Sequence, residues 1–222
     1  AAITRADNLA LAQARIFADN DPVATLELLH GLSPGADWRR IRQLAATAQD
    51  RGLPVVLQGH QAALSRAVFS ADSSRLATTS DDCTLRVWNL SDRTSRPFFG
   101  HTNEVWRVAW SPDQQRIATS SRDTTVRVWD LERGDAQVLV GHQGGVRNVA
   151  FTPDGNSIYS HSDDHILRRW DLRSGLGHDV DRCSGNNFLW DEHQVSCITD
   201  TGEVHIHDLS TGLRTDLRAD LP

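Results

Sequence analysis

Four residue types that exchange protons and hydrogen bonds recur together in this sequence: histidine, serine or threonine, aspartate and tryptophan. The three sets are His60, Thr78, Asp82 and Trp88; His101, Thr119, Asp123 and Trp129; and His142, Ser160, Asp164 and Trp170. A hydroxyl, an imidazole and a carboxylate are the components of a nucleophilic triad. The same side chains can instead form a buried relay in which the indole N–H and both imidazole nitrogens are satisfied by hydrogen bonds.

The spacing of the sets favours the second interpretation. The three histidines lie 41 residues apart, and so do the three tryptophans. Such a period is typical of a repeated structural unit, whereas a catalytic site is rarely present in three copies. We also find no phosphate-binding glycine loop, no kinase catalytic loop and no nucleophile elbow. The sequence therefore predicts a structural role for the sets, with no catalytic residues and no cofactor.

Two clusters offer ligands for a metal ion. The first is His161, Asp163, Asp164 and His165, and the second is His205 and His207 beside Cys197. Alternate residues of a strand point to the same face, which is a workable ligand geometry. However, Asp164 already has a partner in its structural set, and the other histidines fall in loops or in a degenerate repeat. We therefore predict no metal site.

The sequence around the sets predicts short strands separated by turns. Each copy begins with Gly-His and an apolar run, passes through a turn and Ser-x-Asp, and ends with Arg-x-Trp-Asp/Asn-Leu. The innermost strands are expected at Leu64–Phe69, Val105–Trp110 and Val146–Phe151. Second strands follow from Arg75, Arg116 and Ser157, and third strands end at Asn89, Asp130 and Asp171.

This pattern, with its period of about 40–45 residues, resembles the WD-repeat family. The resemblance implies four-stranded propeller blades at residues 59–99, 100–140 and 141–182, and a degenerate blade at 183–222. In the last blade Cys183 stands at the His position and His207 at the Trp position, so we expect it to lack the hydrogen-bond set. The expected fold is mainly β, a partial WD-repeat β-propeller. A lone strand at Pro54–Leu57 would complete another blade.

Residues 1–53 carry helical signals instead, which predicts about three helices before the repeat region at 54–222. This segment loosely resembles half of a tetratricopeptide-like unit. It resembles more closely the helical lead-in to WD repeats in large bacterial multidomain proteins, including receptor-like serine/threonine kinases. Because the chain begins at Ala1 and contains no methionine, we expect it to be a processed product, a trimmed chain or a fragment of a larger protein.

Composition narrows the class of partner and the compartment. The formal net charge of −6 provides no basic field for nucleic acid, and no stretch approaches the length of a membrane span. The three cysteines, Cys83, Cys183 and Cys197, are expected to be free thiols. This expectation favours a reducing, cytoplasmic location, although a membrane helix upstream would allow the repeats to lie outside the cytoplasm.

The resemblance implies a non-catalytic scaffold or sensor module that binds a protein or peptide. The candidate face comprises Gln61, Ala63, Arg66, Asn103, Glu104, Trp106, Arg107, Gly145, Arg147 and Asn148. Tryptophan and arginine most often dominate binding energy, but Trp106 suits the core between blades equally well.

Two alternatives are a complete scaffold that closes by oligomerisation and an enzyme that uses the propeller channel. Seven blades are usual in the family, so about three repeats are missing. We therefore expect open blade edges, which favour self-association.

Overall fold

The computed structural model describes residues 57–183, 189–190, 194–199 and 203–217. The chain divides into two compact units, Ala1–Gln58 and Gly59–Pro222. The helices expected over residues 1–53 lie outside the described residues, as does most of the strand expected at 54–57. The account below therefore concerns the second unit.

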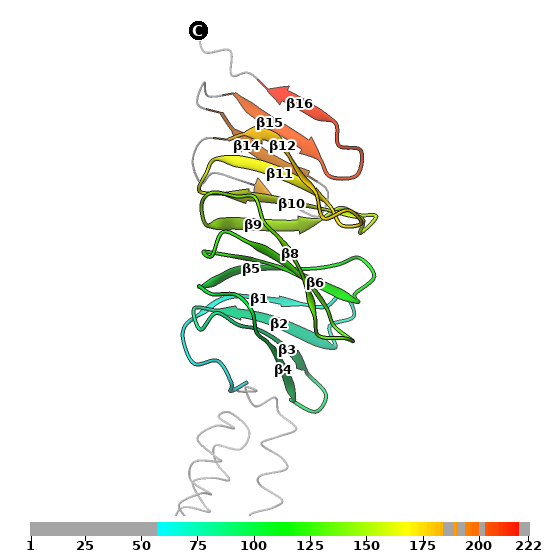
Figure 1. Ribbon diagram of the computed structural model, residues 1–222. Coiled ribbons are helices and arrows are strands. Elements are labelled where there is room, and N and C mark those ends of the chain that lie inside the picture. The colour runs from blue at the N-terminus through cyan, green and yellow to red at the C-terminus, as the bar shows by residue number, and fades with distance from the viewer. Residues whose placement is uncertain (1–56, 184–188, 191–193, 200–202, 218–222) are drawn as a thin grey trace, which may run out of the picture. The chain divides into compact units, whose positions relative to one another are not determined.

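The described residues of this unit form four antiparallel sheets of four strands each, and the strands of each sheet follow one another in chain order (Figure 1). The first sheet contains β1 (Leu64–Phe69), β2 (Arg75–Ser80), β3 (Leu85–Asn89) and β4 (Ser95–Phe98). The second contains β5 (Val105–Trp110), β6 (Arg116–Ser121), β7 (Val126–Asp130) and β8 (Ala136–Leu139). The third contains β9 (Val146–Phe151), β10 (Ser157–Ser162), β11 (Ile166–Asp171) and β12 (Gly177–Arg182). The fourth contains β13 (Leu189–Trp190), β14 (Gln194–Ile198), β15 (Val204–Asp208) and β16 (Arg214–Leu217).

The prediction of a mainly β fold is thereby confirmed for the described part of the chain. The innermost strands of the first three sheets have the predicted bounds, and the sequence did not identify β12. None of the described residues forms a helix that is long and apolar enough to cross a membrane.

The turn after each innermost strand is fixed by a hydroxyl and by a left-handed residue. In the first sheet, Ser70 Oγ donates to Asp72 Oδ1 at 2.6 Å and accepts the backbone N–H of Arg75 at 2.9 Å. Ser111 and Thr152 repeat these bonds in the second and third sheets. The left-handed positions are Ser73, Gln114 and Gly155, with φ values of 57°, 58° and 69°. Local side-chain bonds of this kind favour turns over continued strands.

The core lies between successive sheets, and each layer repeats the previous one. The first layer joins sheets one and two through Ala77, Leu85, Phe98, Val108, Ile117 and Trp129. The second joins sheets two and three through Ala118, Val126, Val128, Leu139, Val146, Val149, Phe151, Ile158 and Trp170. The third joins sheets three and four through Tyr159, Leu167, Cys183, Val195, Cys197 and Leu209. Because every layer needs two sheets, the strands acquire their stability from neighbouring repeats.

One irregular pair in the third sheet shows how a repeat tolerates an arginine. Arg169 stands where the first two sheets have valine, and it lies opposite Tyr159 in the β10–β11 register. Tyr159 itself replaces the alanine of the other repeats and is 2% exposed. The Arg169 guanidinium lies 5.8 Å from the centre of the Tyr159 ring, and it donates to Ser157 Oγ at 3.3 Å. The larger aromatic ring thus supports the aliphatic stem and the charge together.

The prediction of three free thiols is wrong. Cys183 and Cys197 form a disulfide across the start of the fourth sheet, and their Cα atoms are 5.4 Å apart. The two cysteines are 14 residues apart in the sequence, and they become neighbours only where the residue after β12 packs against β14. Cys83 is free. The argument for a reducing compartment from the cysteines therefore no longer holds.

Candidate functional site

The structure brings together each of the three hydrogen-bond sets. In the second sheet, Trp129 Nε1 donates to Thr119 Oγ1 at 2.8 Å, and the same oxygen lies 2.8 Å from His101 Nε2. The other imidazole nitrogen, His101 Nδ1, lies 2.7 Å from Asp123 Oδ2. Because the carboxylate needs a donor, the imidazole carries its proton on Nδ1, and the threonine hydroxyl donates to Nε2. The corresponding atoms lie 2.7–2.9 Å apart in the first and third sheets.

The Ser-x-Asp turns hold the carboxylates of these sets in place. Ser121 Oγ accepts the N–H of Asp123 at 3.0 Å and donates to Glu104 O at 2.8 Å. Thr125 Oγ1 then donates to Asp123 Oδ1 at 2.7 Å. The third sheet has Ile166 at the position of Thr125, so its aspartate loses this hydroxyl bond. The three repeats therefore share one framework with one fewer bond in the third.

The pKa values of Asp82, Asp123 and His101 are all lowered in the fold, by hydrogen bonds for the aspartates and by burial for the histidine. Burial alone would raise the pKa of Asp82, but hydrogen bonds from Thr84, Gln61 and His60 outweigh it and lower the pKa to about 2. Bonds from His101 and Thr125 likewise hold the pKa of Asp123 well below its ordinary value despite burial. Burial lowers the pKa of His101, and the nearby Asp123 opposes this effect. The second set thus contains an ionised carboxylate beside a neutral imidazole.

The geometry of these hydroxyls does not suit a nucleophile. Thr78, Thr119 and Ser160 are 4%, 0% and 0% exposed. Each oxygen already accepts an indole N–H, and the indole closes one side of it. A nucleophile must be within reach of its substrate. The arrangement therefore stabilises the sheets.

Replacing His101 by alanine is expected to lower the free energy of unfolding by about 1 kcal/mol or more, because Asp123 and Thr119 would lose their buried partner. The thermal melting midpoint measures the effect. The exposed His178 on β12 offers a matched control, and its replacement by alanine should leave the midpoint unchanged. An unchanged midpoint for His101→Ala would refute the structural role.

The arginine of each Arg-x-Trp motif belongs to the same assembly, although the sequence did not identify it. Arg127 Cζ lies 5.9 Å from the centre of the Trp129 ring, and its guanidinium fills the space beside Gly100. Arg86 and Arg168 repeat this arrangement against Gly59 and Gly141. A side chain at these glycines would collide with the arginine. The repeated Gly-His therefore has a steric cause, which comparing the three copies could have suggested.

Part of the predicted partner face is held in a network between the second and third sheets. Trp106 Nε1 donates to Glu104 Oε2 at 3.0 Å, and the Arg147 guanidinium lies 4.1 Å from the centre of the Trp106 ring. Arg147 also forms two bonds of 2.7 and 3.0 Å with Asp163. Gly145 packs directly against the indole. Trp106 is half-buried, so its ring contributes to this contact between the second and third sheets and also to the surface.

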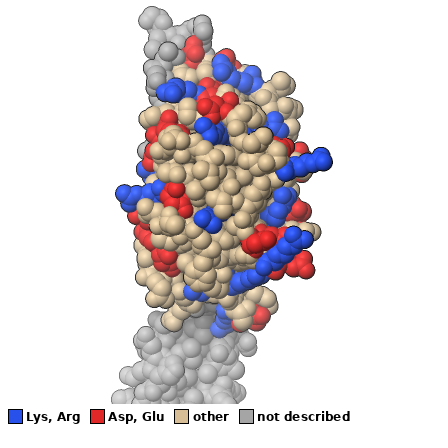
Figure 2. Space-filling model, viewed as in Figure 1, with Lys and Arg blue, Asp and Glu red and all other residues tan. Residues whose placement is uncertain are grey.

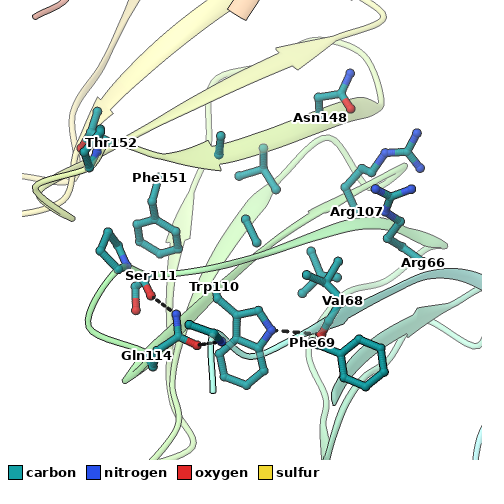
Figure 3. Close-up of a pocket in the computed structure, with 17 residues that line it drawn as sticks. Arg66, Val68, Phe69, Arg107, Trp110, Ser111, Gln114, Asn148, Phe151 and Thr152 are labelled. Atoms are coloured by element: carbon teal, nitrogen blue, oxygen red, sulfur yellow. Dashed lines mark hydrogen bonds between the residues drawn. The ribbon is translucent and has the colours of Figure 1, made fainter. Parts of the chain in front are cut away.

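A second part of the predicted face borders a cavity of about 650 Å³ along the innermost strands (Figure 3). Arg66, Arg107 and Asn148 lie at one end of it, on β1, β5 and β9. Its wall is formed by repeated apolar residues, namely Val68, Ala109 and Ala150, with Phe69, Trp110 and Phe151. Burial, followed by the nearby charges of Arg66 and Arg147, lowers the pKa of Arg107.

The remaining predicted face residues are engaged in local bonds. Gln61 donates its backbone N–H to Asp82 Oδ2 at 2.8 Å, and the Ala63 carbonyl accepts the N–H of Asp81 at 3.0 Å. Asn103 Oδ1 accepts the N–H of Glu104 at 2.9 Å. These residues shape the loops, whereas the cavity end presents charged groups.

The structure brings together the side chains of only one of the two histidine clusters. In the first, Asp164 bonds to His142 and Asp163 to Arg147, so its carboxylates are already used. Burial lowers the pKa of His161 to about 4. The second cluster does come together, and it includes Asp181, which the sequence reasoning missed. Asp181 Oδ2 lies 2.7 Å from His205 Nδ1 and 2.8 Å from His207 Nε2.

Comparison with known families identifies three repeats in the chain. A family described as WD domain, G-beta repeat matches residues 52–89, 93–130 and 135–171, which together make up more than half of the chain. The matched segments end at the last residue of β3, β7 and β11. No curated protein matches the chain.

Proposed function

Because the chain belongs to the WD domain, G-beta repeat family, we propose that it is a protein-interaction module whose sheets are blades of a β-propeller. WD repeats are typically non-catalytic and mediate protein binding. The partner we propose is a peptide segment of a protein that carries an acidic residue next to an apolar one. It would contact the cavity along β1, β5 and β9.

The contrast between the arginines of the unit carries this proposal. Arg147 pairs with Asp163, and Arg122 pairs with Glu104 at 3.0 Å. Neither Arg66 nor Arg107 has a carboxylate within ion-pair distance among the described residues, and both border the cavity. A bound carboxylate would offset the repulsion between them, since a charge-assisted bond to arginine is strong.

The apolar wall of the cavity supports the proposal that the peptide carries an apolar residue next to the acidic one. Trp110 is half-buried, and its Nε1 donates to Val68 O at 3.1 Å, which fixes the orientation of the ring. Arg75 stacks on this ring at 4.7 Å. A rigid aromatic wall beside exposed cations is typical of binding hot spots. On the face seen in Figure 2, acidic and basic side chains are interspersed, so a local site rather than a general field would select the partner.

Replacing Arg107 by glutamate is expected to weaken peptide binding at least about tenfold without changing the melting midpoint, because one hot-spot contact contributes more than 1 kcal/mol. The probe is an array of peptides in which phenylalanine or leucine is flanked by acidic residues, with lysine-substituted counterparts. Fluorescence anisotropy then measures the affinity of the best peptide. Arg133→Glu makes the same charge change in the β7–β8 turn and serves as the control. Equal binding by Arg107→Glu and the unaltered protein, or a preference for the lysine peptides, would refute the proposal.

The wider context is a further part of the proposal. The helical signals of residues 1–53 support a sensor or scaffold region of a larger multidomain protein, of the bacterial signalling type with a serine/threonine kinase. Sequencing the reading frame beyond Ala1 and Pro222 tests this context directly. A frame without a catalytic domain would remove the kinase from the proposal.

The alternative is a stand-alone scaffold that closes by oligomerisation, and one observation favours it. Phe69 is 59% exposed on β1, whereas Phe151, at the same position of the third repeat, is 7% exposed. Leu64 on the same strand is 60% exposed. Exposed apolar groups on an innermost strand are a feature of an interface. A concentration-dependent mass in sedimentation would support this alternative, and a monomer at all concentrations would exclude it.

A further inference from the structure

The fourth sheet replaces five side chains of the regular repeat at once. Counting 41 residues along the sequence from His142 leads to Cys183, and Cys197 occupies the position of Ser160 in the strand register. His207 occupies the position of Trp170, and His205 that of Arg168. The registers establish the positions of Cys197, His205 and His207. His207 lies opposite Val195 as Trp170 lies opposite Ile158, and His205 lies opposite Cys197 as Arg168 lies opposite Ser160.

The fifth replacement depends on a bulge. In the second sheet, Val126 lies opposite the buried Leu139, and in the first sheet Leu85 lies opposite the buried Phe98. In the third sheet, a register shift between Leu167 and Arg168 places Asp181 opposite Leu167. A carboxylate thus faces the fourth sheet where the other repeats present an apolar side chain. In the first layer, the corresponding contact is the packing of Phe98 on Trp129, with ring centres 5.7 Å apart.

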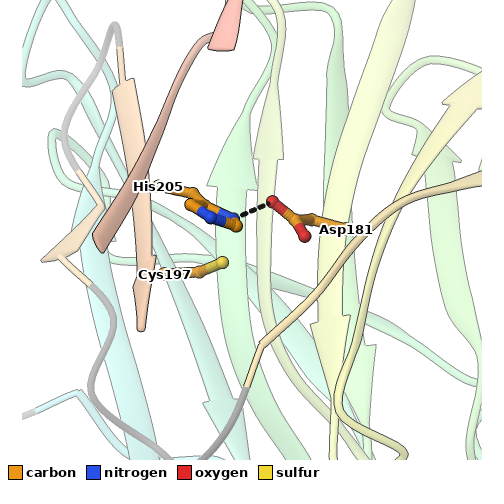
Figure 4. Close-up of side chains that lie close together, drawn as sticks. All are labelled: Asp181, Cys197 and His205. Carbon is orange, nitrogen blue, oxygen red and sulfur yellow. Dashed lines mark hydrogen bonds and ion pairs between the residues drawn. The ribbon is translucent and has the colours of Figure 1, made fainter. Parts of the chain in front are cut away.

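Asp181, Cys197 and His205 lie close together between the third and fourth sheets (Figure 4). Cys183 is bonded to Cys197, and His207 Nε2 lies 2.8 Å from Asp181 Oδ2. Cys183 and Cys197 are 0% exposed, His207 is 2% exposed and His205 is 5% exposed. An oxygen of Asp181, the sulfur of Cys197 and a ring nitrogen of His205 all lie within 4.8 Å of one another. His205 Nε2 is buried without a hydrogen bond among the described residues, and its nearest carboxylate oxygens, on Glu203 and Asp216, are 3.6 and 3.7 Å away.

These replacements share a chemistry that packing alone does not require. Thiolate, imidazole and carboxylate are the three side-chain ligands of Zn²⁺, and a structural zinc site takes four of them in a tetrahedron. A disulfide sulfur is a poor ligand, because the thiolate is the metal-binding form of cysteine. The cluster can therefore bind a metal ion only after the Cys183–Cys197 bond is reduced.

We propose that the reduced protein binds one Zn²⁺ ion through Cys183, Cys197, His205 and Asp181, with His207 orienting the carboxylate. A small-molecule thiol reductant supplies two electrons and two protons, which convert the disulfide into two thiols while the reductant is oxidised to its own disulfide. Zn²⁺ then displaces the two thiol protons to solvent. The ion would link the third sheet to the fourth in reducing conditions, and the disulfide would close the fourth sheet in oxidising conditions.

The test uses the full 222-residue chain, reduced by a phosphine and transferred to metal-free, oxygen-free buffer. Co²⁺ is titrated as a spectroscopic probe, and Zn²⁺ is then added in competition with a chromophoric chelator. We expect one equivalent of Co²⁺ to produce the strong visible bands of a tetrahedral site together with a thiolate charge-transfer band, both lost when Zn²⁺ displaces it. The oxidised chain should bind at least about 100-fold more weakly, since it lacks both thiolates.

Matched variants assign the ligands. Cys197→Ser should abolish the charge-transfer contribution of one thiolate and weaken binding by more than about 100-fold, whereas Cys83→Ser, which alters the cysteine outside the cluster, should have no effect. His207→Gln should weaken binding by only about 10- to 100-fold, as expected for a residue that orients a ligand. If Cys197→Ser does not fold, His205→Gln provides the ligand test. A cobalt spectrum without thiolate bands, equal binding by both redox forms, or an effect of Cys83→Ser equal to that of Cys197→Ser would overturn the proposal.

Discussion

Replacing Trp129 by alanine is expected to lower the free energy of unfolding by about 3–5 kcal/mol, the range for removing a large buried aromatic side chain. Trp129 is 2% exposed and packs against Phe98 from the preceding sheet. Its indole N–H also bonds to Thr119, whose hydroxyl connects it to His101. The substitution would thus open a cavity between two sheets and leave a buried hydroxyl with one partner fewer. Urea unfolding monitored by circular dichroism measures the change.

Trp106→Ala is the matched control, because it removes the same side chain from the half-buried network around Glu104 and Arg147. We expect this variant to lose less than half as much stability. Trp129→Phe should fall between the two, since it keeps an aromatic ring but removes the buried donor to Thr119, at a cost of about 1–3 kcal/mol. Similar losses for Trp129→Ala and Trp106→Ala would contradict the assigned layers.

The strands of the regular repeats could be predicted closely because the same sequence pattern occurs three times. The 41-residue period placed the strands β1, β5 and β9, and the family comparison confirms the WD repeats. The resemblance to the WD-repeat family indicated which four side chains would meet, and a buried indole, hydroxyl, imidazole and carboxylate can satisfy one another. Repetition thus supplied the register information that a single strand pattern lacks.

The irregular fourth sheet could not be predicted in the same way. The sequence correctly placed His207 at the Trp position of this repeat, although His207 follows Trp170 by 37 residues instead of 41. Asp181 becomes a core residue only because of the bulge in β12, which the sequence does not reveal. The Cys183–Cys197 pairing joins the residue after β12 to β14, a contact that follows from the packing of two sheets. Local pattern is insufficient where a bulge decides which face a side chain occupies.

The sequence did not show which residues of the candidate face are available to a partner and which are bonded within the fold. The resemblance grouped Arg107 with Arg147, although one borders the cavity and the other is paired with Asp163. Which arginine finds a carboxylate depends on cross-strand neighbours, and these follow from register and rotamer rather than from residue type. The charges available to a partner therefore emerge only from the folded arrangement.

Lowering the pH from 7 to 3 is expected to reduce the free energy of unfolding in two stages. Burial lowers the pKa of His101 and His142, so the folded protein keeps them neutral while the unfolded chain takes up protons below about pH 6.5. The stability they contribute is complete above that pH and declines as the pH falls. Below about pH 4, the unfolded chain also protonates its aspartates, whereas hydrogen bonds keep Asp82 and Asp123 ionised in the fold.

The two stages have the same sign, because in both the unfolded chain binds more protons than the folded one. The lowering of the pKa of Asp82 from 3.8 to about 2 corresponds to about 2 kcal/mol of stability, which is lost progressively as the pH falls toward 2. Urea unfolding at a series of pH values measures the curve.

Asp123→Asn isolates one carboxylate of the second stage. This variant should be less stable at pH 7, because the amide replaces an ionised partner of His101. It should also lose less stability between pH 5 and 3, because the group that stays ionised in the fold is gone. Asp135→Asn makes the same change at an exposed position and should reproduce the unaltered curve. If Asp123→Asn has the full slope below pH 5, the ionised carboxylate of this set does not stabilise the fold, and the framework must depend on apolar packing alone.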